Sequence, residues 1–263
     1  MNKWTIKEVE EKLLQIQTET DPFFEDIGKD KRKGVQNLLS KWKRRNEQIQ
    51  QAEAKFYQMT SYERMARLEG YELIAGIDEV GRGPLAGPVV AACVILPKTF
   101  KLIGLDDSKK LSEAKREEFF EQIKENAISI GIGILHAEEI DRWNIYEATK
   151  KAMLASIEQL SIKPDYLLID AMPLETPFPY ASIIKGDANS ISIAAASVIA
   201  KVTRDRMMKK LHEQFPQYHF SKNMGYGTKE HLLALEKYGI TSYHRKSFEP
   251  VKTMATCSIS QGN

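Results

Sequence analysis

The first seventy residues are polar and carry their apolar side chains at helical spacing. Residues 5–8 (TIKE) have the spacing of a capping box, and Val9 and Leu13 follow on one helical face. The dipeptide at 21–22 (DP) predicts the end of that first helix. Further apolar positions predict a second helix around Val35, Leu38, Leu39 and Trp42 and a third over about 47–69. The pattern thus predicts a helical N-terminal extension over residues 1–70.

The pattern changes near Gly70, where short runs rich in Val, Ile and Leu begin. Predicted strands cover 72–78, 89–96, 127–135, 166–170 and 181–185. Predicted helices cover 112–125, 144–160, 190–215 and 228–238. Three strands followed by alternating helix and strand indicate an α/β layer structure with a mixed sheet. We expect a catalytic domain over residues 71–252 and a flexible tail over 253–263.

Composition adds only a few exclusions. The 263 residues are 42% hydrophobic and 28% charged, which is ordinary for a globular protein. Apolar runs such as 89–96 are too short to span a bilayer, and the N-terminus carries no signal-peptide pattern, so a cytoplasmic protein without a membrane segment is expected. The net charge of +2 is uninformative by itself. A local excess of positive charge is formed by Lys29, Lys31, Arg32, Lys33, Lys41, Lys43, Arg44 and Arg45.

Carboxylates end three of the predicted strands. Asp78 and Glu79 follow the first strand, Asp170 the fourth, and Asp187 comes just after the fifth. One interpretation is that these are turn residues, which Asp favours. The other is that they converge at one sheet edge, where their repulsion requires a cation and their hard oxygens suit Mg²⁺ or Mn²⁺. Because no Cys/His ligand spacing occurs, zinc is not expected. The second interpretation predicts two-metal phosphodiester chemistry.

A glycine-rich segment at 78–88 (DEVGRGPLAGP) begins with the first two carboxylates. Glycine allows positive φ and close approach of backbone amides to a ligand, although a plain hairpin connection is the alternative. The segment is no P-loop, because no Gly-Lys-Ser/Thr follows at the required spacing.

With this segment the chain resembles the type 2 ribonucleases H, the ribonuclease HII family. The signature lies at 78–83 (DEVGRG). Further similar segments follow in family order at 105–112 (LDDSKKLS), 169–171 (IDA), 185–188 (KGDA), 194–206, 225–228 (GYGT) and 244–248 (HRKSF). The resemblance covers residues 72 to about 252 and gives no guidance for residues 1–70.

The resemblance implies a ribonuclease H-like mixed sheet flanked by helices, with a helical C-terminal part. It implies a Mn²⁺- or Mg²⁺-dependent endoribonuclease that acts as a monomer on RNA/DNA hybrids and on DNA duplexes containing ribonucleotides. Cleavage on the 5′ side of the ribonucleotide would leave 3′-hydroxyl and 5′-phosphate ends, in ribonucleotide removal and RNA primer processing. The implied catalytic and metal-binding residues are Asp78, Glu79, Asp170 and Asp187. The implied substrate-binding residues are Gly81, Arg82 and Gly83 at the 2′-hydroxyl, Tyr226 at the junction, and Ser108, Lys109 and Lys110 at phosphate.

Several alternatives stay open at this point. A type 3 ribonuclease H shares the carboxylates but resembles a different glycine segment, and a non-catalytic duplex-binding module would keep the fold alone. The basic cluster at 29–45 could bind duplex backbone, or the N-terminal helices could pack onto the catalytic core. The second half of the 190–215 helix carries basic residues that could form a solvated face or in part contact phosphates: Lys201, Arg204, Arg206, Lys209 and Lys210. His231 and His244 could transfer protons, although structural or phosphate-contact roles are expected for them.

Overall fold

The computed structural model describes residues 4–260, with side chains through residue 256. Contacts divide the chain into two compact units, one up to Tyr57 and one beginning at Gln58. We expected the catalytic part to begin at residue 71. The compact unit begins earlier because helix α4 (Ser61–Leu68) packs with the sheet. Glu63 on this helix is buried, and its Oε1 accepts hydrogen bonds from Ser190 Oγ at 2.6 Å and Ser192 N at 2.9 Å.

The first unit is built from helices α1 (Ile6–Leu13), α2 (Pro22–Gly28) and the long α3 (Lys33–Met59). The capping box is present: Thr5 Oγ1 accepts from Glu8 N at 3.2 Å, and Glu8 Oε2 accepts from Thr5 N at 2.7 Å. The dipeptide at 21–22 starts α2, with Asp21 as N-cap and Pro22 in the first turn. The second and third predicted helices are one continuous helix, α3, up to Met59.

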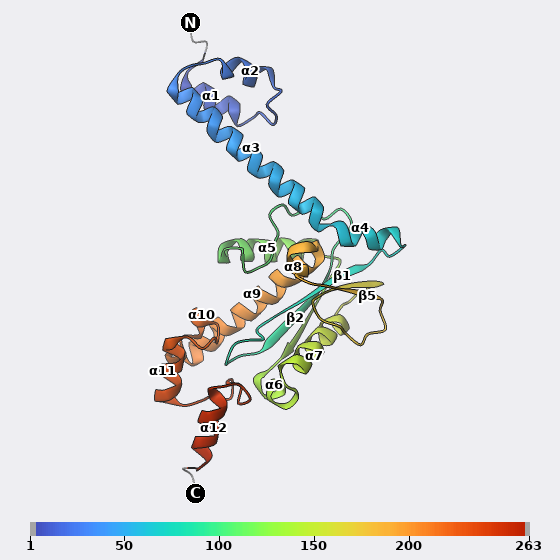
Figure 1. Ribbon diagram of the computed structural model, residues 1–263, viewed down its shortest axis with the longest axis vertical. Helices are drawn as coiled ribbons and strands as arrows, with labels where there is room; N and C mark the ends of the chain where they lie inside the picture. The colour runs from blue at the N-terminus through green and yellow to red at the C-terminus, as the bar shows by residue number, and fades with distance from the viewer. Residues whose placement is uncertain (1–3, 261–263) are drawn as a thin grey trace. The chain divides into compact units, whose positions relative to one another are not determined.

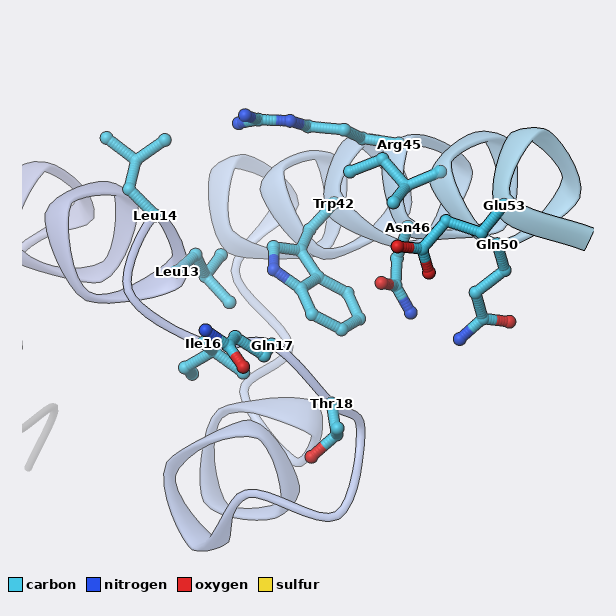
Figure 2. Close-up of a pocket in the computed structure, with 11 residues that line it drawn as sticks. Leu13, Leu14, Ile16, Gln17, Thr18, Trp42, Arg45, Asn46, Gln50 and Glu53 are labelled. Carbon is cyan, nitrogen blue, oxygen red and sulfur yellow. The ribbon is translucent and has the colours of Figure 1, made fainter. Parts of the chain in front are cut away.

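The apolar residues of this unit form a hydrophobic cluster of their own. Its buried members are Val9, Leu13, Phe24, Ile27, Val35, Leu39 and Trp42. The rings of Phe24 and Trp42 lie 4.5 Å apart between centroids. A surface pocket beside this cluster is lined by Leu13, Ile16 and Trp42 together with polar groups such as Asn46 (Figure 2). These apolar side chains are therefore accounted for within the first unit.

The second unit contains a mixed five-stranded sheet in the order β3-β2-β1-β4-β5. The strands are β1 (Ile74–Val80), β2 (Val89–Ile95), β3 (Ser129–Leu135), β4 (Tyr166–Asp170) and β5 (Tyr180–Ile183). β1, β2 and β3 pair antiparallel, whereas β4 and β5 join parallel to β1. The predicted strands and the mixed sheet are confirmed.

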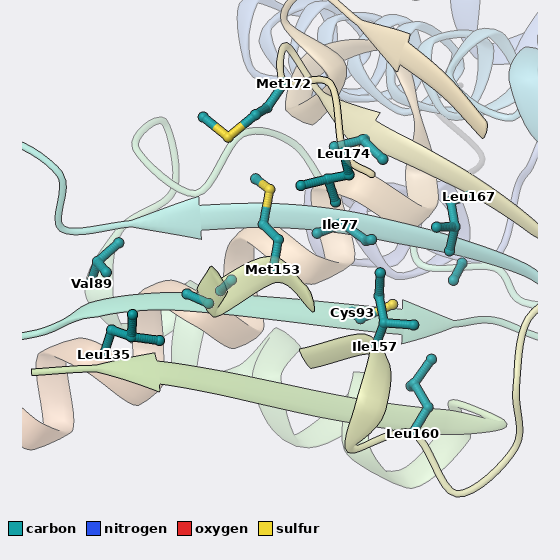
Figure 3. Close-up of a cluster of buried hydrophobic side chains, with 14 of the residues drawn as sticks. Ile77, Val89, Cys93, Leu135, Met153, Ile157, Leu160, Leu167, Met172 and Leu174 are labelled. Carbon is teal, nitrogen blue, oxygen red and sulfur yellow. The ribbon is translucent and has the colours of Figure 1, made fainter. Parts of the chain in front are cut away.

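Helices cover both faces of the sheet (Figure 1). α9 (Ile191–Gln214) packs on one face over β1 and β2, with α5 (Glu113–Asn126) beside it. α6 (Ala137–Trp143) and α7 (Ile145–Glu158) cover the other face. Gly76 makes the close approach of α9 possible, because a Cβ there would lie 2.0 Å from the Ser192 carbonyl carbon. Figure 3 shows the core between the sheet and α7, including Ile77, Met153 and Leu167.

The chain after α9 forms a small helical part around a second cluster. Its helices are α10 (Phe220–Asn223), α11 (Lys229–Tyr238) and α12 (Val251–Ser260), with the 3-10 turn η1 (Pro216–Tyr218). The sequence predicts a flexible tail over 253–263, whereas the structure has α12 there, with Val251 buried and Met254 against the cluster. Residues 261–263 of that tail lie outside the described residues. None of the helices in the described part of the chain is long and apolar enough to cross a membrane.

Candidate active site

Two of the expected carboxylates lie at the ends of neighbouring parallel strands. β1 and β4 pair up to Ile77 and Ile169, and Asp78 and Asp170 are the next residues on each strand. Because side chains alternate along a strand, both aspartates share the face of Gly76, which α9 covers. Asp78 is 5% exposed, and its Oδ1 accepts from Glu79 N at 2.7 Å. Sheet topology thus brings Asp78, Glu79 and Asp170 to one edge.

The turn after β5 adds the fourth carboxylate. Lys185 adopts a left-handed conformation (φ 55°) and leads into the short helix α8 (Gly186–Asn189), which carries the buried Asp187. Gly186 N donates to Asp170 Oδ1 at 2.7 Å, which fixes this turn against β4. A Cβ at position 186 would lie 2.5 Å from Ile193 Cδ1 and 3.3 Å from Asp170 Oδ1. Glycine therefore permits the approach of Asp187 to Asp170.

The four carboxyl groups repel one another inside a poorly solvated site. Burial raises the pKa of each of them above its ordinary value. Glu79 and Asp170 raise the pKa of Asp78 further, and Asp107 and Asp170 do the same for the pKa of Asp187. Lys109 offsets part of this charge, with its Nζ 3.7 Å from Asp187 Oδ2 and 4.0 Å from Asp107 Oδ1.

The oxygen-rich set fits a divalent cation chemically. Glu79 Oε2 is buried and has no hydrogen-bond partner among the described residues, so it is available to a ligand of positive charge. Carboxylate oxygens are the ligands that Mg²⁺ and Mn²⁺ prefer. In the part of the chain that the structure describes, no three His, Cys, Asp or Glu side chains already stand close enough together to hold an ion.

Beside the carboxylates lies the glycine-rich loop, held in a conformation that requires glycine. Gly81 has φ +91°, and a Cβ there would lie 2.2 Å from Arg204 Nε and 2.7 Å from the Pro88 carbonyl oxygen. Gly87 also has positive φ (+85°), and a Cβ there would lie 2.4 Å from Met208 Sδ. The side chain of Arg82 leaves the loop towards Glu79, with Nη1 3.3 Å from Glu79 Oε1.

Two buried arginines hold this loop by donating hydrogen bonds to its backbone carbonyl oxygens. Arg204 donates to the carbonyl oxygens of Pro88 (2.8 Å), Ala86 (3.1 Å) and Met224 (2.9 Å). Arg245 donates to the carbonyl oxygens of Gly81 (2.5 Å), Arg82 (2.9 Å) and Gly87 (2.9 and 3.0 Å). Burial lowers the pKa of Arg204 to about 10 and the pKa of Arg245 to about 9, so both stay protonated at neutral pH.

Sequence reasoning missed these loop-holding roles. For Arg204 the sequence indicates a surface charge or a phosphate contact, and it is neither, because it is 1% exposed. Its spacing from Ala200 and Met208, four residues each way, was the signal that places it on the buried face of α9.

Tyr226 lies against the same loop. Its side chain is about half exposed (49% for the residue), and a Cβ on Gly83 would lie 3.5 Å from Tyr226 Cε1. The carbonyls of Gly81 and Arg82 are taken up by Arg245, whereas the amides of residues 81–83 donate no hydrogen bond to any described residue. The loop that follows Asp78 and Glu79 thus has amides without a partner among the described residues, and the Tyr226 ring lies next to it at Gly83.

The predicted phosphate loop is brought near the carboxylates, but its three residues differ in placement. Ser108 is 3% exposed, and its Oγ bonds Ser197 Oγ at 2.9 Å, so its hydroxyl is turned into the protein. The Lys109 side chain is 75% exposed and faces Asp187. Lys110 pairs with Asp106 at 3.2 Å. Only the two lysines have side chains that solvent reaches.

Comparison with known proteins identifies the family. The family model described as "Ribonuclease HII" matches residues 75–251, and "Ribonuclease HII N-terminal domain" matches residues 5–67. Ribonuclease HII of Bacillus cytotoxicus is 58% identical, covering 97% of this chain and 98% of its own. Ribonuclease HII of Geobacillus sp. strain WCH70 is 59% identical, covering 97% of this chain and 92% of its own. The N-terminal helices, for which the resemblance gave no guidance, thus also match a described family domain.

Solved structures agree with this assignment. Ribonuclease H2 from Pyrococcus horikoshii OT3 matches with a TM-score of 0.62 and 25% identity, covering 72% of this chain and 99% of its own. Ribonuclease HII from Archaeoglobus fulgidus, solved in a complex with PCNA, matches with a TM-score of 0.59 and 29% identity, covering 67% of this chain and 95% of its own. Bst-RNase HIII in complex with Mn²⁺ shares only the fold, at 16% identity and a TM-score of 0.55 over 73% of this chain and 72% of its own. The chain therefore belongs to the ribonuclease HII family, endoribonucleases that cleave the RNA of RNA/DNA hybrids and ribonucleotides embedded in DNA.

Proposed function

We propose that this enzyme hydrolyses the phosphodiester on the 5′ side of a ribonucleotide, both in RNA/DNA hybrids and at single ribonucleotides in duplex DNA. The products carry 3′-hydroxyl and 5′-phosphate ends. The observation that carries the proposal is the position of four carboxylates, two of them buried and two partly buried, beside a loop with available amides and the exposed ring of Tyr226. One edge of the sheet thus offers chemistry and sugar recognition together.

Asp78, Glu79, Asp170 and Asp187 are proposed to hold Mg²⁺ or Mn²⁺. A divalent cation at these oxygens supplies Lewis acidity, activating a water for in-line attack and offsetting charge on the leaving oxygen. The chain's part is to keep the carboxylates fixed: Gly186 N holds Asp170 Oδ1, and Glu79 N holds Asp78 Oδ1. The partnerless Glu79 Oε2 is the oxygen that gains most from an ion, because burial without a partner is costly.

Recognition of the ribonucleotide is assigned to Gly81, Arg82, Gly83 and Tyr226. The amides of residues 81–83 suit hydrogen bonding to a 2′-hydroxyl and its flanking phosphate, the features that separate RNA from DNA. Tyr226 lies over Gly83. A side chain larger than that of glycine at position 83 would compete with the sugar for space. The ring offers a flat apolar surface on which a sugar or base at the junction can stack.

Phosphate contact is assigned to Lys109 and Lys110, whose side chains reach solvent beside the carboxylates. Ser108 instead anchors the loop to α9, because its hydroxyl bonds Ser197 on that helix. Arg116 supports the same loop by donating to the carbonyl oxygens of Ser108 (3.1 Å) and Leu111 (2.6 Å).

The proposal is tested with a 5′-labelled DNA duplex that carries one ribonucleotide. In Mn²⁺ or Mg²⁺ the enzyme should cut once, on the 5′ side of the ribonucleotide, and the labelled product should be extendable by a polymerase from its 3′-hydroxyl. An all-DNA duplex of the same sequence is the control. Cutting of the all-DNA duplex, or a product ending in a 3′-phosphate, would show that the assigned recognition or chemistry is wrong. A chain that binds both duplexes and cuts neither would be a non-catalytic module.

A further inference from the structure

Two buried histidines lie behind the Tyr226 loop. His231 is in the first turn of α11, and His244 is in the segment that follows α11. They are 0% and 1% exposed, and their Nε2 atoms are 3.0 Å apart. The rings of Tyr218 and Phe220 pack around the pair, with Tyr218 5.0 Å from His244 and Phe220 5.3 Å from His231 between centroids.

The hydrogen bonds around this pair specify where each ring proton lies. Thr241 N, which can only donate, is 2.9 Å from His244 Nδ1, so that nitrogen accepts and carries no proton. Neutral His244 then carries its proton on Nε2 and donates to His231 Nε2. His231 must in turn carry its proton on Nδ1, which lies 2.9 Å from the Tyr226 carbonyl oxygen. All four ring nitrogens are used in one directed chain.

This chain has no place for a second proton. If His231 were charged, both Nε2 atoms would carry hydrogens 3.0 Å apart and the central bond would be lost. If His244 were charged, its Nδ1 would carry a hydrogen facing the Thr241 N–H at 2.9 Å, and that bond would be lost. Burial lowers the pKa of His231, and burial together with His231 lowers the pKa of His244 to about 4. Both rings are therefore neutral at physiological pH. They are also buried, so they are unsuited to proton transfer with the substrate.

The chain of bonds ends on the backbone that presents Tyr226. The Tyr226 carbonyl also accepts from Thr228 N at 2.8 Å, and Tyr226 N donates to the Asn223 carbonyl at 2.9 Å. On the other side, the His244 segment is bridged to the glycine-rich loop: Gly87 N donates to the Tyr243 carbonyl at 2.9 Å, and Arg245 N to the Leu85 carbonyl at 2.8 Å. The histidine pair therefore links the two surfaces that meet at Gly83.

We propose that His231 and His244 are positioning residues that fix Tyr226 over Gly83, so that the enzyme discriminates a ribonucleotide from a deoxyribonucleotide. The inference rests on the proposed recognition role of Tyr226. The bond from His231 Nδ1 fixes the position of the Tyr226 carbonyl, and the bond from His244 Nε2 fixes the tautomer of His231. Displacement of the ring by about 1 Å is enough to cost on the order of a hundredfold in rate at a preorganised site.

The tautomers are tested by ¹⁵N NMR of the full chain labelled at histidine, with His231→Asn and His244→Asn used for assignment. At pH 7 we expect protonated Nδ1 on His231 and protonated Nε2 on His244. This measurement does not depend on activity. A charged ring, or His231 protonated on Nε2, would overturn the chain of bonds and the proposal with it.

The link to recognition is tested by a double-mutant cycle with Tyr226→Ala. His231→Leu should lower kcat/KM on DNA with one ribonucleotide at least tenfold, on the scale expected for a misplaced recognition group. Its Mn²⁺ affinity, measured by calorimetry, should stay that of the wild type. His231→Asn keeps a donor near the Nδ1 position and should restore part of the rate.

In the double variant, removal of His231 should cost little beyond Tyr226→Ala alone. Multiplying losses would mean that His231 acts elsewhere and would overturn the inference. Should Tyr226→Ala itself leave cleavage unchanged, the proposed recognition role of Tyr226 fails, while the NMR result still reports on the histidine pair. A His231→Leu chain that does not fold is replaced in the cycle by His231→Asn, whose loss must likewise disappear in the Tyr226→Ala background.

Discussion

Replacement of Gly81 by alanine disturbs the glycine-rich loop at its most constrained point. Gly81 has φ +91°, where an alanine is strained by about 1–2 kcal/mol. The added Cβ would also lie 2.2 Å from Arg204 Nε, so the guanidinium must move. Arg204 makes three hydrogen bonds to backbone carbonyls, and each bond to a charged donor contributes about 1.5–3 kcal/mol. Loss of one such bond plus the backbone strain gives a destabilisation of about 2.5–5 kcal/mol.

Gly70→Ala is the matched control. Gly70 also has positive φ (+98°), but a Cβ there meets no atom within 4 Å. It should cost only the strain of about 1–2 kcal/mol. For a unit of this size each kcal/mol lowers the melting temperature by about 2–4 °C, so thermal melts separate the two variants. Gly81→Ala should also lower kcat/KM on the order of a hundredfold because Gly83 is displaced, whereas Gly70→Ala should cut normally. Equal melting temperatures and equal rates for the two variants would refute the bracing of the loop by Arg204.

Three further predictions follow from the same contacts. The folded-state pKa of Asp78 is raised above its unfolded value, so the metal-free enzyme loses stability as pH rises above the ordinary carboxyl pKa of about 4. In EDTA at pH 8, Asp78→Asn should therefore melt at a higher temperature than wild type. In Mn²⁺ the variant should show no comparable gain in melting temperature. Tyr226→Ala should weaken cleavage at a single ribonucleotide while calorimetry finds Mn²⁺ affinity unchanged, and an all-DNA duplex should stay uncut. A chain beginning at Gln58 should cut at the same position but bind DNA with a shallower salt dependence: the slope of log affinity against log salt should fall by roughly 0.9 per lost phosphate contact. A chain beginning at Gly70 should also melt at a lower temperature, because it lacks Glu63.

The sheet and the carboxylate positions could be predicted because their signals are local. Strand β4 was predicted with the bounds that the structure has, Tyr166–Asp170, since an apolar run ends there in a turn-forming aspartate. The pairing of β1 with β4 was not in that pattern, yet it is what puts Asp78 and Asp170 side by side. The resemblance supplied this convergence where local reasoning left turn residues as an alternative.

The buried charged and polar residues that support the site could not be predicted from local sequence signals. Arg204 and Arg245 are charges that by default face solvent, and only backbone carbonyls far away in sequence explain their burial. The hydroxyl of Ser108, which the resemblance places in a phosphate-contacting loop, bonds Ser197 on another element. Glu63 ties α4 to the N-terminus of α9 across more than a hundred residues, and the compact unit that contains the sheet begins at Gln58. In each case a long-range contact decided the outcome.

Two members of the basic cluster of the first unit form ion pairs within it, and Lys43 is one of them, with its Nζ 3.2 Å from Glu19 Oε2. Arg32 is tied to Asp30 Oδ2 at 2.7 Å and to the Trp4 carbonyl at 2.9 Å, so it serves the fold of this unit. Lys29 and Lys31, between α2 and α3, and Lys33 and Lys41, on α3, are exposed. Since the apolar residues of this unit are buried among themselves, the duplex-binding hypothesis needs no change in its packing.

The four-carboxylate site is tested most directly by Asp78→Asn on a DNA duplex with one ribonucleotide. Asp78 is 5% exposed, and asparagine keeps its size while removing the charge that would hold a cation. Turnover in saturating Mn²⁺ should fall by several orders of magnitude, as expected for the loss of several kcal/mol of transition-state stabilisation. The uncut substrate should still bind. Near-normal turnover of Asp78→Asn would contradict the assignment of Asp78, Glu79, Asp170 and Asp187 as the site of hydrolysis.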